Sequence, residues 1–284
     1  MANVMVTGAS TGIGRATAAH LVARGHQVFA GVRKPADADA LTGDLGDRLV
    51  PLLLDVTDAD QVAAAAREVE LRAPEGLHGL VNNAGIAVGG PLEHLPIDEV
   101  RRQLEVNVVA QVAVTQALLP AIRRTTGRIV FIGSLSGRVG MPMIGPYAAS
   151  KHALEGLTES WRAELAPWGI RVALIEPGSI KTEIWAKGKD QADEMAEQLP
   201  PEAVARYSDH IAMVRSMVEA QDKAGIPPAK VARTVERALF SARWRPRYQV
   251  GLDSRGAAII SRVLPDRAKA ATLGLAGGAR LPKA

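Results

Sequence analysis

The chain has 284 residues, of which 47% are hydrophobic and 23% charged, a composition typical of a globular protein that can bury a sizeable core. It contains no cysteine, which excludes disulfides, thiolate catalysis and thiolate metal sites, and its six histidines show no metal-ligand spacing. No apolar run approaches the length of a membrane-spanning helix, and the first expected strand starts too close to Met1 for a signal peptide. These features predict a soluble cytoplasmic protein without a metal.

Short apolar runs alternate with helical patterns along the chain. The expected strands are, in order, ANVMVTG, HQVFAGV, RLVPLLLD, GLHGLVNNA, GRIVFIGS, IRVALIEPG and RYQVG. Helices are expected near 13–24, 58–73, 98–124, 145–166 and 229–242, with a short one in the polar segment 35–47. Runs rich in Val, Ile and Leu that alternate with helices indicate a parallel sheet covered on both faces. The sequence thus predicts an α/β fold, a doubly wound parallel sheet of Rossmann type, in one domain over residues 1–284.

A glycine-rich turn, TGASTGIG at residues 7–14, follows the first expected strand and precedes a helical pattern. Gly8, Gly12 and Gly14 permit a tight turn and a close approach of the backbone, and the helix beyond them offers free N–H groups to a diphosphate. The spacing is G-x-x-x-G-x-G rather than G-x-G-x-x-G. A purely steric role for these glycines therefore stays open from the turn alone.

The second expected strand ends in AGVRKP, and its last residues bear on the choice of cofactor. A dinucleotide-binding fold selects NAD with an acidic residue about twenty positions after the glycines, whereas an arginine accommodates the 2′-phosphate of NADP. Val32 stands at the position of the carboxylate, and Arg33 and Lys34 follow it. Because a guanidinium can bind a phosphate at two points, the sequence predicts NADP as the cofactor. The alternative is a solvent-facing arginine without a ligand.

Three polar residues in the middle of the chain suggest acid–base chemistry. Ser134 ends the apolar run RIVFIGS, and Tyr147 and Lys151 lie four residues apart in YAASK. On a helix these two share a face, so the ammonium would favour the phenolate and lower the pKa of Tyr147 from its ordinary value of about 10. The serine hydroxyl would hold a carbonyl or alcohol oxygen at the tyrosine's proton. The hydride must come from a cofactor, since no side chain carries one.

These motifs, together with NNAG at residues 82–85, Asn107 in VNVVAQ and the dipeptide Pro177-Gly178, resemble the short-chain dehydrogenase/reductase family in order and spacing. The likeness covers about residues 4–182 and favours the short, single-domain oxidoreductase branch. It implies that the catalytic residues are Asn107, Ser134, Tyr147 and Lys151. It also implies cofactor contacts from Gly8, Ser10, Thr11, Gly12, Ile13, Gly14, Arg33, Lys34, Asp55, Val56, Asn83, Ala84, Gly85, Tyr147, Lys151, Pro177, Gly178, Ile180 and Thr182.

Competing roles remain for some of these residues. Asp55 in LLLDVTD resembles the family's contact to the adenine amino group, but an aspartate before a helix is equally suited to capping it. Asp58 is the better cap candidate, because it directly precedes the helical pattern. Asn107 falls within an expected helix, where the likeness implies that it breaks the helix bonding and holds a water linked to Lys151; the alternative is a plain buried asparagine. The asparagine side chains of NNAG are expected to brace neighbouring strands while its backbone passes the adenosine ribose.

The segment of residues 179–228 follows the Pro-Gly dipeptide, and we expect it to form a mobile helical lid over the substrate. A wide apolar pocket beneath it would suit a bulky lipophilic alcohol or ketone, although methionine and aromatic stripes are equally compatible with a plain core. Residues 242–267 add a weaker likeness to family members that act on hydroxysteroids and retinoids. The expected substrate contacts are Ser134, Leu135, Met141, Met143, Tyr147 and Trp185.

The net charge of +4 is uneven, because residues 241–284 contain nine Lys or Arg and two Asp or Glu and therefore carry +7. The favoured interpretation of the basic C-terminal extension, residues 251–284, is a solvated surface. The alternative is loose docking to an anionic membrane surface, aided by AAIISRVL. Nucleic-acid binding is not expected. The family likeness implies a homodimer or homotetramer, formed through the helices at 98–124 and 145–166.

Three functions compete. The favoured one is an NADP-dependent alcohol dehydrogenase or carbonyl reductase. A 3-oxoacyl-thioester reductase is the enzymatic alternative, although the long lid and tail argue against it. A non-catalytic NADP-binding sensor is the third, and it need not keep Ser134, Tyr147 and Lys151 together.

Overall fold

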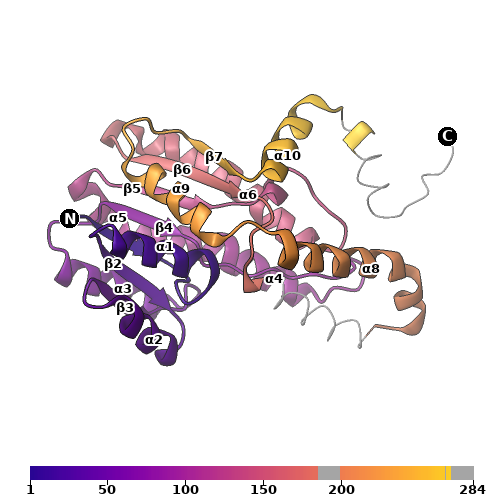
Figure 1. Cartoon of the computed structure of the whole chain (residues 1–284), viewed down its shortest axis with the longest axis horizontal. Helices are drawn as coiled ribbons and strands as arrows, with labels where there is room; N and C mark the ends of the chain where they lie inside the picture. Colours follow the sequence, from indigo (N-terminus) through magenta and orange to yellow (C-terminus); the bar gives the residue numbers. More distant parts are fainter. Residues whose placement is uncertain (185–198, 266, 270–284) are drawn as a thin grey trace.

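The computed structural model describes residues 1–184, 199–265 and 267–269, and it contains one seven-stranded sheet (Figure 1). Neighbouring strands all run parallel, in the spatial order β3-β2-β1-β4-β5-β6-β7. The predicted doubly wound parallel sheet is therefore confirmed. Its strands, each within an expected apolar run, are β1 (Asn3–Val6), β2 (Gln27–Val32), β3 (Leu49–Leu53), β4 (Gly79–Asn82), β5 (Arg128–Ile132), β6 (Arg171–Pro177) and β7 (Arg247–Val250).

Helices cover both faces of the sheet, which explains the nearly continuous apolar runs. Val4, Met5 and Val6 are all fully buried, although neighbouring side chains on a strand point to opposite faces. Val4 and Val6 pack in one core cluster and Met5 in another. The first cluster is completed by α1 (Gly12–Ala23), α2 (Pro35–Leu45) and α9 (Pro228–Phe240), and the second by α3 (Ala59–Arg72), α5 (Ala110–Thr125) and α6 (Gly145–Leu165).

The helix expected over 98–124 is interrupted. It consists of α4 (Ile97–Leu104), a π-helical turn η1 (Glu105–Val109) and α5. The continuous run 97–125 is the one helix among the described residues that is long and apolar enough to cross a membrane, so the expectation that no stretch reaches that length is wrong. In this fold the run packs against β4, α3 and α6, as a core helix does.

The centre of the sheet positions a ligand site. The chain leaves β1 toward β2 and β3 on one side, and β4 toward β5 and β6 on the other. Loops that part in this way leave a crevice beyond the carboxyl ends of the strands, where open α/β sheets bind ligands. The hydroxyl of Thr7, directly after β1, accepts hydrogen bonds from the N–H groups of Asn83 and Ala84, both at 3.0 Å. The two loops that flank the crevice are thereby joined at its base.

The C-terminal part adds elements beside this crevice. A parallel bridge between Ile180 and Ile226 closes the base of the expected lid, which contains the long helix α8 (Pro201–Ala224). Helix α10 (Leu252–Val263) follows β7, and Figure 1 shows α8 and α10 extending from the same end of the sheet. Residue 266 and residues 270–284 lie outside the described part, so docking of the basic extension to a membrane stays a prediction. The described part of the chain also contains two short 3₁₀ turns, η2 (Leu135–Gly137) and η3 (Ala166–Trp168).

Candidate active site

A cavity of about 580 Å³ lies along the carboxyl edge of the sheet, lined by residues that follow six of its strands. Most of the predicted cofactor and substrate residues line it. Gly14, Lys34, Asn107 and Met143 do not, and Trp185 lies outside the described residues. The predicted residues that line the cavity are Gly8, Ser10, Thr11, Gly12, Ile13, Arg33, Asp55, Val56, Asn83, Ala84, Gly85, Ser134, Leu135, Met141, Tyr147, Lys151, Pro177, Gly178, Ile180 and Thr182.

The glycine-rich turn is folded tightly against the loop after β4. A Cβ on Gly8, whose φ is +62°, would lie 2.8 Å from the Cα of Ala84, and one on Gly14 would overlap the carbonyl oxygen of Gly8. The side-chain amide of Asn83 donates to the carbonyl oxygens of Thr7 and Gly8, at 2.9 and 3.0 Å, so the expected bracing role of this asparagine is confirmed. Gly14 therefore serves packing, which explains why it does not reach the cavity.

The start of α1 is suited to an anionic group. The helix begins at Gly12, so the first N–H groups have no partner within the helix and point toward the cavity end of the axis. Thr182, which follows β6, lies against this turn: a Cβ added at Gly12 would be 3.2 Å from the methyl group of Thr182. The backbone cradle and the small cross-section of the turn fit a diphosphate.

The end of β2 carries no carboxylate. Val32 is 1% exposed and lines the cavity, and the exposed Arg33 lines it next to Val32. Lys34 immediately precedes α2 and is not among the residues that line the cavity. A single guanidinium thus stands where a ribose phosphate of a dinucleotide is expected.

The two aspartates after β3, Asp55 and Asp58, have different roles. Asp58 caps α3, since its carboxylate accepts from the N–H groups of Asp60 and Gln61 at 2.9 and 3.1 Å. Asp55 instead accepts from the N–H and the hydroxyl of Thr57 at 3.0 and 2.7 Å, and it lines the cavity. Partial burial opposes its charge, but these hydrogen bonds outweigh it, so the pKa of Asp55 is lowered. The prediction that Asp58 is the better cap is confirmed.

Asn107 is fully buried in the π-helical turn η1, where the expected break in helix bonding occurs. Its amide nitrogen donates to the carbonyl of Ile86 and to the hydroxyl of Ser150, both at 3.0 Å, and its amide oxygen accepts from the N–H of Ile86 at 2.9 Å. Ser150 in turn donates to the carbonyl of Tyr147 at 2.7 Å. Asn107 therefore links the loop after β4 to the backbone of α6 from behind the cavity wall.

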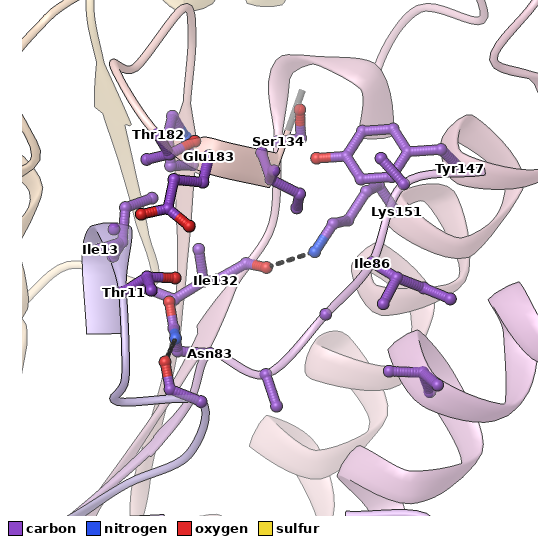
Figure 2. Close-up of a pocket in the computed structure, with 18 of the residues that line it drawn as sticks. Thr11, Ile13, Asn83, Ile86, Ile132, Ser134, Tyr147, Lys151, Thr182 and Glu183 are labelled. Atoms are coloured by element: carbon purple, nitrogen blue, oxygen red, sulfur yellow. Dashed lines mark hydrogen bonds between the residues drawn. The ribbon is translucent and has the colours of Figure 1, made fainter. Parts of the chain in front are cut away.

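The three residues expected to carry acid–base chemistry meet at one end of the cavity. Figure 2 shows the Tyr147 hydroxyl beside Ser134, with the Lys151 side chain alongside the ring. The Lys151 ammonium donates to the carbonyl of Ile132 at 2.8 Å and lies 5.6 Å from the centre of the Tyr147 ring. Ser134 hydrogen-bonds the phenol, and its hydroxyl oxygen accepts from the N–H of Ser136 at 3.1 Å. The turn after β5 and one face of α6 thus build the group together.

Burial dominates the electrostatics of this group. Tyr147 and Lys151 are each 5% exposed. Burial raises the pKa of Tyr147 above its ordinary value, while the hydrogen bond with Ser134 acts against this rise. Burial also lowers the pKa of Lys151 to about 8. The expectation of a lowered tyrosine pKa is therefore wrong for the protein alone, because the loss of water destabilises the phenolate more than the hydrogen bond with Ser134 stabilises it.

An ion-pair cluster behind α6 was not predicted from the sequence. Glu155 lies one helical turn after Lys151 and pairs with Arg247, while Glu176 on β6 is 2.7 Å from Arg138, which follows η2. Burial raises the pKa of Glu155 to about 7, and its contact with Arg247 opposes this. The cluster ties α6, which carries Tyr147 and Lys151, and η2, which follows Ser134, to the edge of the sheet. An acidic residue inside the apolar run IRVALIEPG was the available signal.

The wall beside Tyr147 is apolar. Leu135, Met141 and Ile144 line it from the loop between β5 and α6, and Ile184 and Met217 line it from the expected lid. Met143 is not among the residues of this wall. Its backbone has a φ of +68°, and its carbonyl accepts from the N–H of Gly90 at 2.7 Å. Sequence patterns cannot show such a left-handed turn at a methionine.

Comparisons with known proteins agree with this geometry. The family model described as short chain dehydrogenase matches residues 2–193. The NADPH-dependent 3-dehydrocapnine reductase of Ornithobacterium rhinotracheale is 37% identical over 94% of this chain and 94% of its own. Retinol dehydrogenase 16 of Homo sapiens is 36% identical over 89% of this chain and 81% of its own. A solved short chain dehydrogenase from Burkholderia cenocepacia J2315, in complex with NADP, shares 30% identity with a TM-score of 0.72 and covers 96% of this chain and 97% of its own. The chain belongs to the short-chain dehydrogenase family.

Proposed function

We propose that the protein is an NADP(H)-dependent oxidoreductase that interconverts a bulky lipophilic alcohol with its ketone or aldehyde. The observation that carries this proposal is the shared cavity. Ser134, Tyr147 and Lys151 meet at its β5–α6 end, and the glycine-rich turn and Arg33 line the same cavity. A proton-transfer group and a dinucleotide cradle are the two parts that such a reaction needs.

The cofactor would be held by the loops at the carboxyl edge of the sheet. The first turn of α1 suits its diphosphate, and Asp55, Asn83 and Thr182, which line the same cavity, would contact the adenosine and the carboxamide. Lys151 would hydrogen-bond the nicotinamide ribose. The bound cofactor supplies the hydride that no side chain can provide.

Tyr147 passes the proton. Its raised pKa keeps the phenol protonated at neutral pH, so it is ready to donate to a substrate carbonyl oxygen as reduction requires. Ser134 holds that oxygen beside the phenol. After donation, the Lys151 ammonium stabilises the phenolate, since the two lie close together in a site with little water. Asn107 positions α6 through Ser150 and supports the return of a proton from solvent.

The substrate is proposed from the apolar wall. Leu135, Met141, Ile144, Ile184 and Met217 all line the cavity, and flexible methionine side chains adapt to irregular apolar groups. The names of two relatives, a 3-dehydrocapnine reductase and a retinol dehydrogenase, support a lipophilic substrate. We also propose a cytoplasmic homodimer or homotetramer, formed through the α4–α5 and α6 helices.

The proposal is tested by NADPH oxidation in the presence of ketosteroids, retinal, small ketones and an acetoacetyl thioester. We expect the bulky lipophilic carbonyls to give the highest kcat/KM. Tyr147→Phe should reduce turnover by about a thousandfold or more, because the proton donor is gone, and should leave NADPH binding nearly unchanged. Turnover of the thioester alone would favour the acyl reductase. NADPH binding with no turnover of any compound would favour the sensor, and full activity of Tyr147→Phe would refute the mechanism.

Cofactor preference tests the role of Arg33. The wild-type protein should prefer NADPH over NADH by about tenfold or more in kcat/KM, because a guanidinium binds the 2′-phosphate. Arg33→Ala should lose most of the activity with NADPH and retain that with NADH. Lys34→Ala is the matched control, since this neighbouring cation does not line the cavity, and it should keep the wild-type ratio. A tenfold preference of the wild-type protein for NADH would overturn the assignment.

The buried Lys151 should make stability depend on pH. Its pKa is about 8 in the folded protein against 10.5 for an ordinary lysine, so the unfolded chain binds more protons between these values and stability rises with pH there. Below that window its burial costs up to about 3 kcal/mol. Lys151→Met should therefore unfold at higher urea concentration than the wild type at neutral pH, although we expect it to be inactive.

The difference in unfolding free energy between Lys151→Met and the wild type should shrink as pH rises through that window. Urea unfolding followed by far-ultraviolet circular dichroism at several pH values measures it. Lys230→Met, which removes an exposed lysine of α9, serves as control and should show no such trend. A constant difference for Lys151→Met across the whole pH range would contradict the assigned burial cost.

A further inference from the structure

Asp253, in the first turn of α10, contacts the loop that forms the cavity wall after β6. Its carboxylate accepts the backbone N–H of Ser179 at 2.6 Å and that of Ser254 at 2.8 Å. The hydroxyl of the buried Ser254 donates to the carbonyl of Glu176 at 2.7 Å. Two consecutive residues of α10 thus bind both ends of the segment 176–179, of which Pro177, Gly178 and Ser179 line the cavity.

The absence of a side chain at Gly178 is explained by the same carboxylate. The three atoms nearest to a Cβ added at Gly178 all belong to the Asp253 side chain, and the added Cβ would overlap them. Gly178 does not have a positive φ, so its backbone conformation is open to any residue. A side chain at Gly178 would therefore displace the carboxylate of Asp253, in addition to any effect on the approach of a cofactor.

Ser179 is also the point where the expected lid joins the core. Its carbonyl accepts the N–H of Ile226 at 2.9 Å, and the carbonyl of Ile226 accepts the N–H of Lys181 at 3.0 Å. The N–H of Ser179 faces Asp253 and its carbonyl faces the far end of the lid. One residue is thereby fixed by the C-terminal helix on one side and by the lid base on the other.

We propose that Asp253 is a positioning residue for the reaction. It holds the peptide between Gly178 and Ser179 in place, and with it the cavity wall next to the acid–base residues and the base of the lid. This inference rests on the proposed function, since the wall it positions includes Pro177 and Gly178, which are expected to contact the cofactor. An acidic residue near the C-terminus, remote in sequence from every site motif, thus sets the geometry for cofactor binding.

The test is a double-mutant cycle on Asp253 and Gly178, read out as the dissociation constant of NADPH by its fluorescence, without substrate. Asp253→Ala should weaken NADPH binding by about fivefold, since the loop loses a charged acceptor that water replaces only in part. Gly178→Ala should weaken it by about tenfold or more in the wild-type background, because the new methyl group displaces the carboxylate and the loop. In the Asp253→Ala background the same change should cost less than about twofold, since the obstacle is gone.

Two control variants separate positioning from general structural damage. Leu252→Ala removes an 83% exposed side chain from the same helical turn and should keep wild-type affinity. Asp253→Asn retains an oxygen that can accept from Ser179 and should restore affinity to within about twofold of the wild type. Thermal unfolding of each variant should stay close to that of Leu252→Ala.

Three results would overturn the proposal. The first is an equal effect of Gly178→Ala in both backgrounds, which would assign the glycine to the cofactor alone. The second is an unchanged affinity in Asp253→Ala, and the third is an equal loss in Asp253→Ala and Asp253→Asn. If the wild-type protein binds NADH in place of NADPH, the proposed cofactor preference fails, and the same cycle measured with NADH still decides the role of Asp253.

Discussion

The shared burial of Tyr147 and Lys151 is the constraint on which the rest of the site depends. Two ionisable groups with little contact with water would be costly without partners, and here each has one. The carbonyl of Ile132 accepts from the ammonium, and Ser134 hydrogen-bonds the phenol. Both partners come from the end of β5. The position of α6 relative to β5 must therefore be kept for Tyr147 and Lys151 to retain these hydrogen bonds. The hydrogen bonds of Asn107 and the ion-pair cluster around Glu155 help to keep α6 in that position.

The sheet supplies a second constraint, close packing of backbone at the crevice. Gly8 and Gly14 allow the first turn to fold against the loop after β4, and Gly178 allows Asp253 to reach the loop after β6. In each case a methyl group would collide with neighbouring protein atoms. The glycines of this site are therefore explained by contacts within the protein, and the space that a cofactor needs follows from the same contacts. Both folding and cofactor binding therefore favour residues without a side chain at these positions.

Most of the fold and the centre of the site could be predicted from the sequence, because periodic apolar runs and short motifs are local signals. The i, i+4 spacing of Tyr147 and Lys151 is of this kind. Long-range contacts leave no such trace: the approach of Asp253 to Gly178 and the cluster around Glu155 depend on how β6, β7 and α10 meet. The expected direction of the Tyr147 pKa shift is wrong for a related reason, since the spacing to Lys151 indicates a neighbouring charge but not the burial that raises the pKa.

The central claim is that a buried phenol transfers the proton under the influence of the neighbouring ammonium. The most direct measurement is a pH titration of the protein labelled with carbon-13 at the tyrosine ring, followed by NMR, since the chain has only three tyrosines. Comparison with Tyr147→Phe assigns the signal. We expect Tyr147 to titrate above the ordinary tyrosine value of about 10, because burial destabilises the phenolate. An ordinary or a lowered pKa of Tyr147 in the wild type would contradict this expectation.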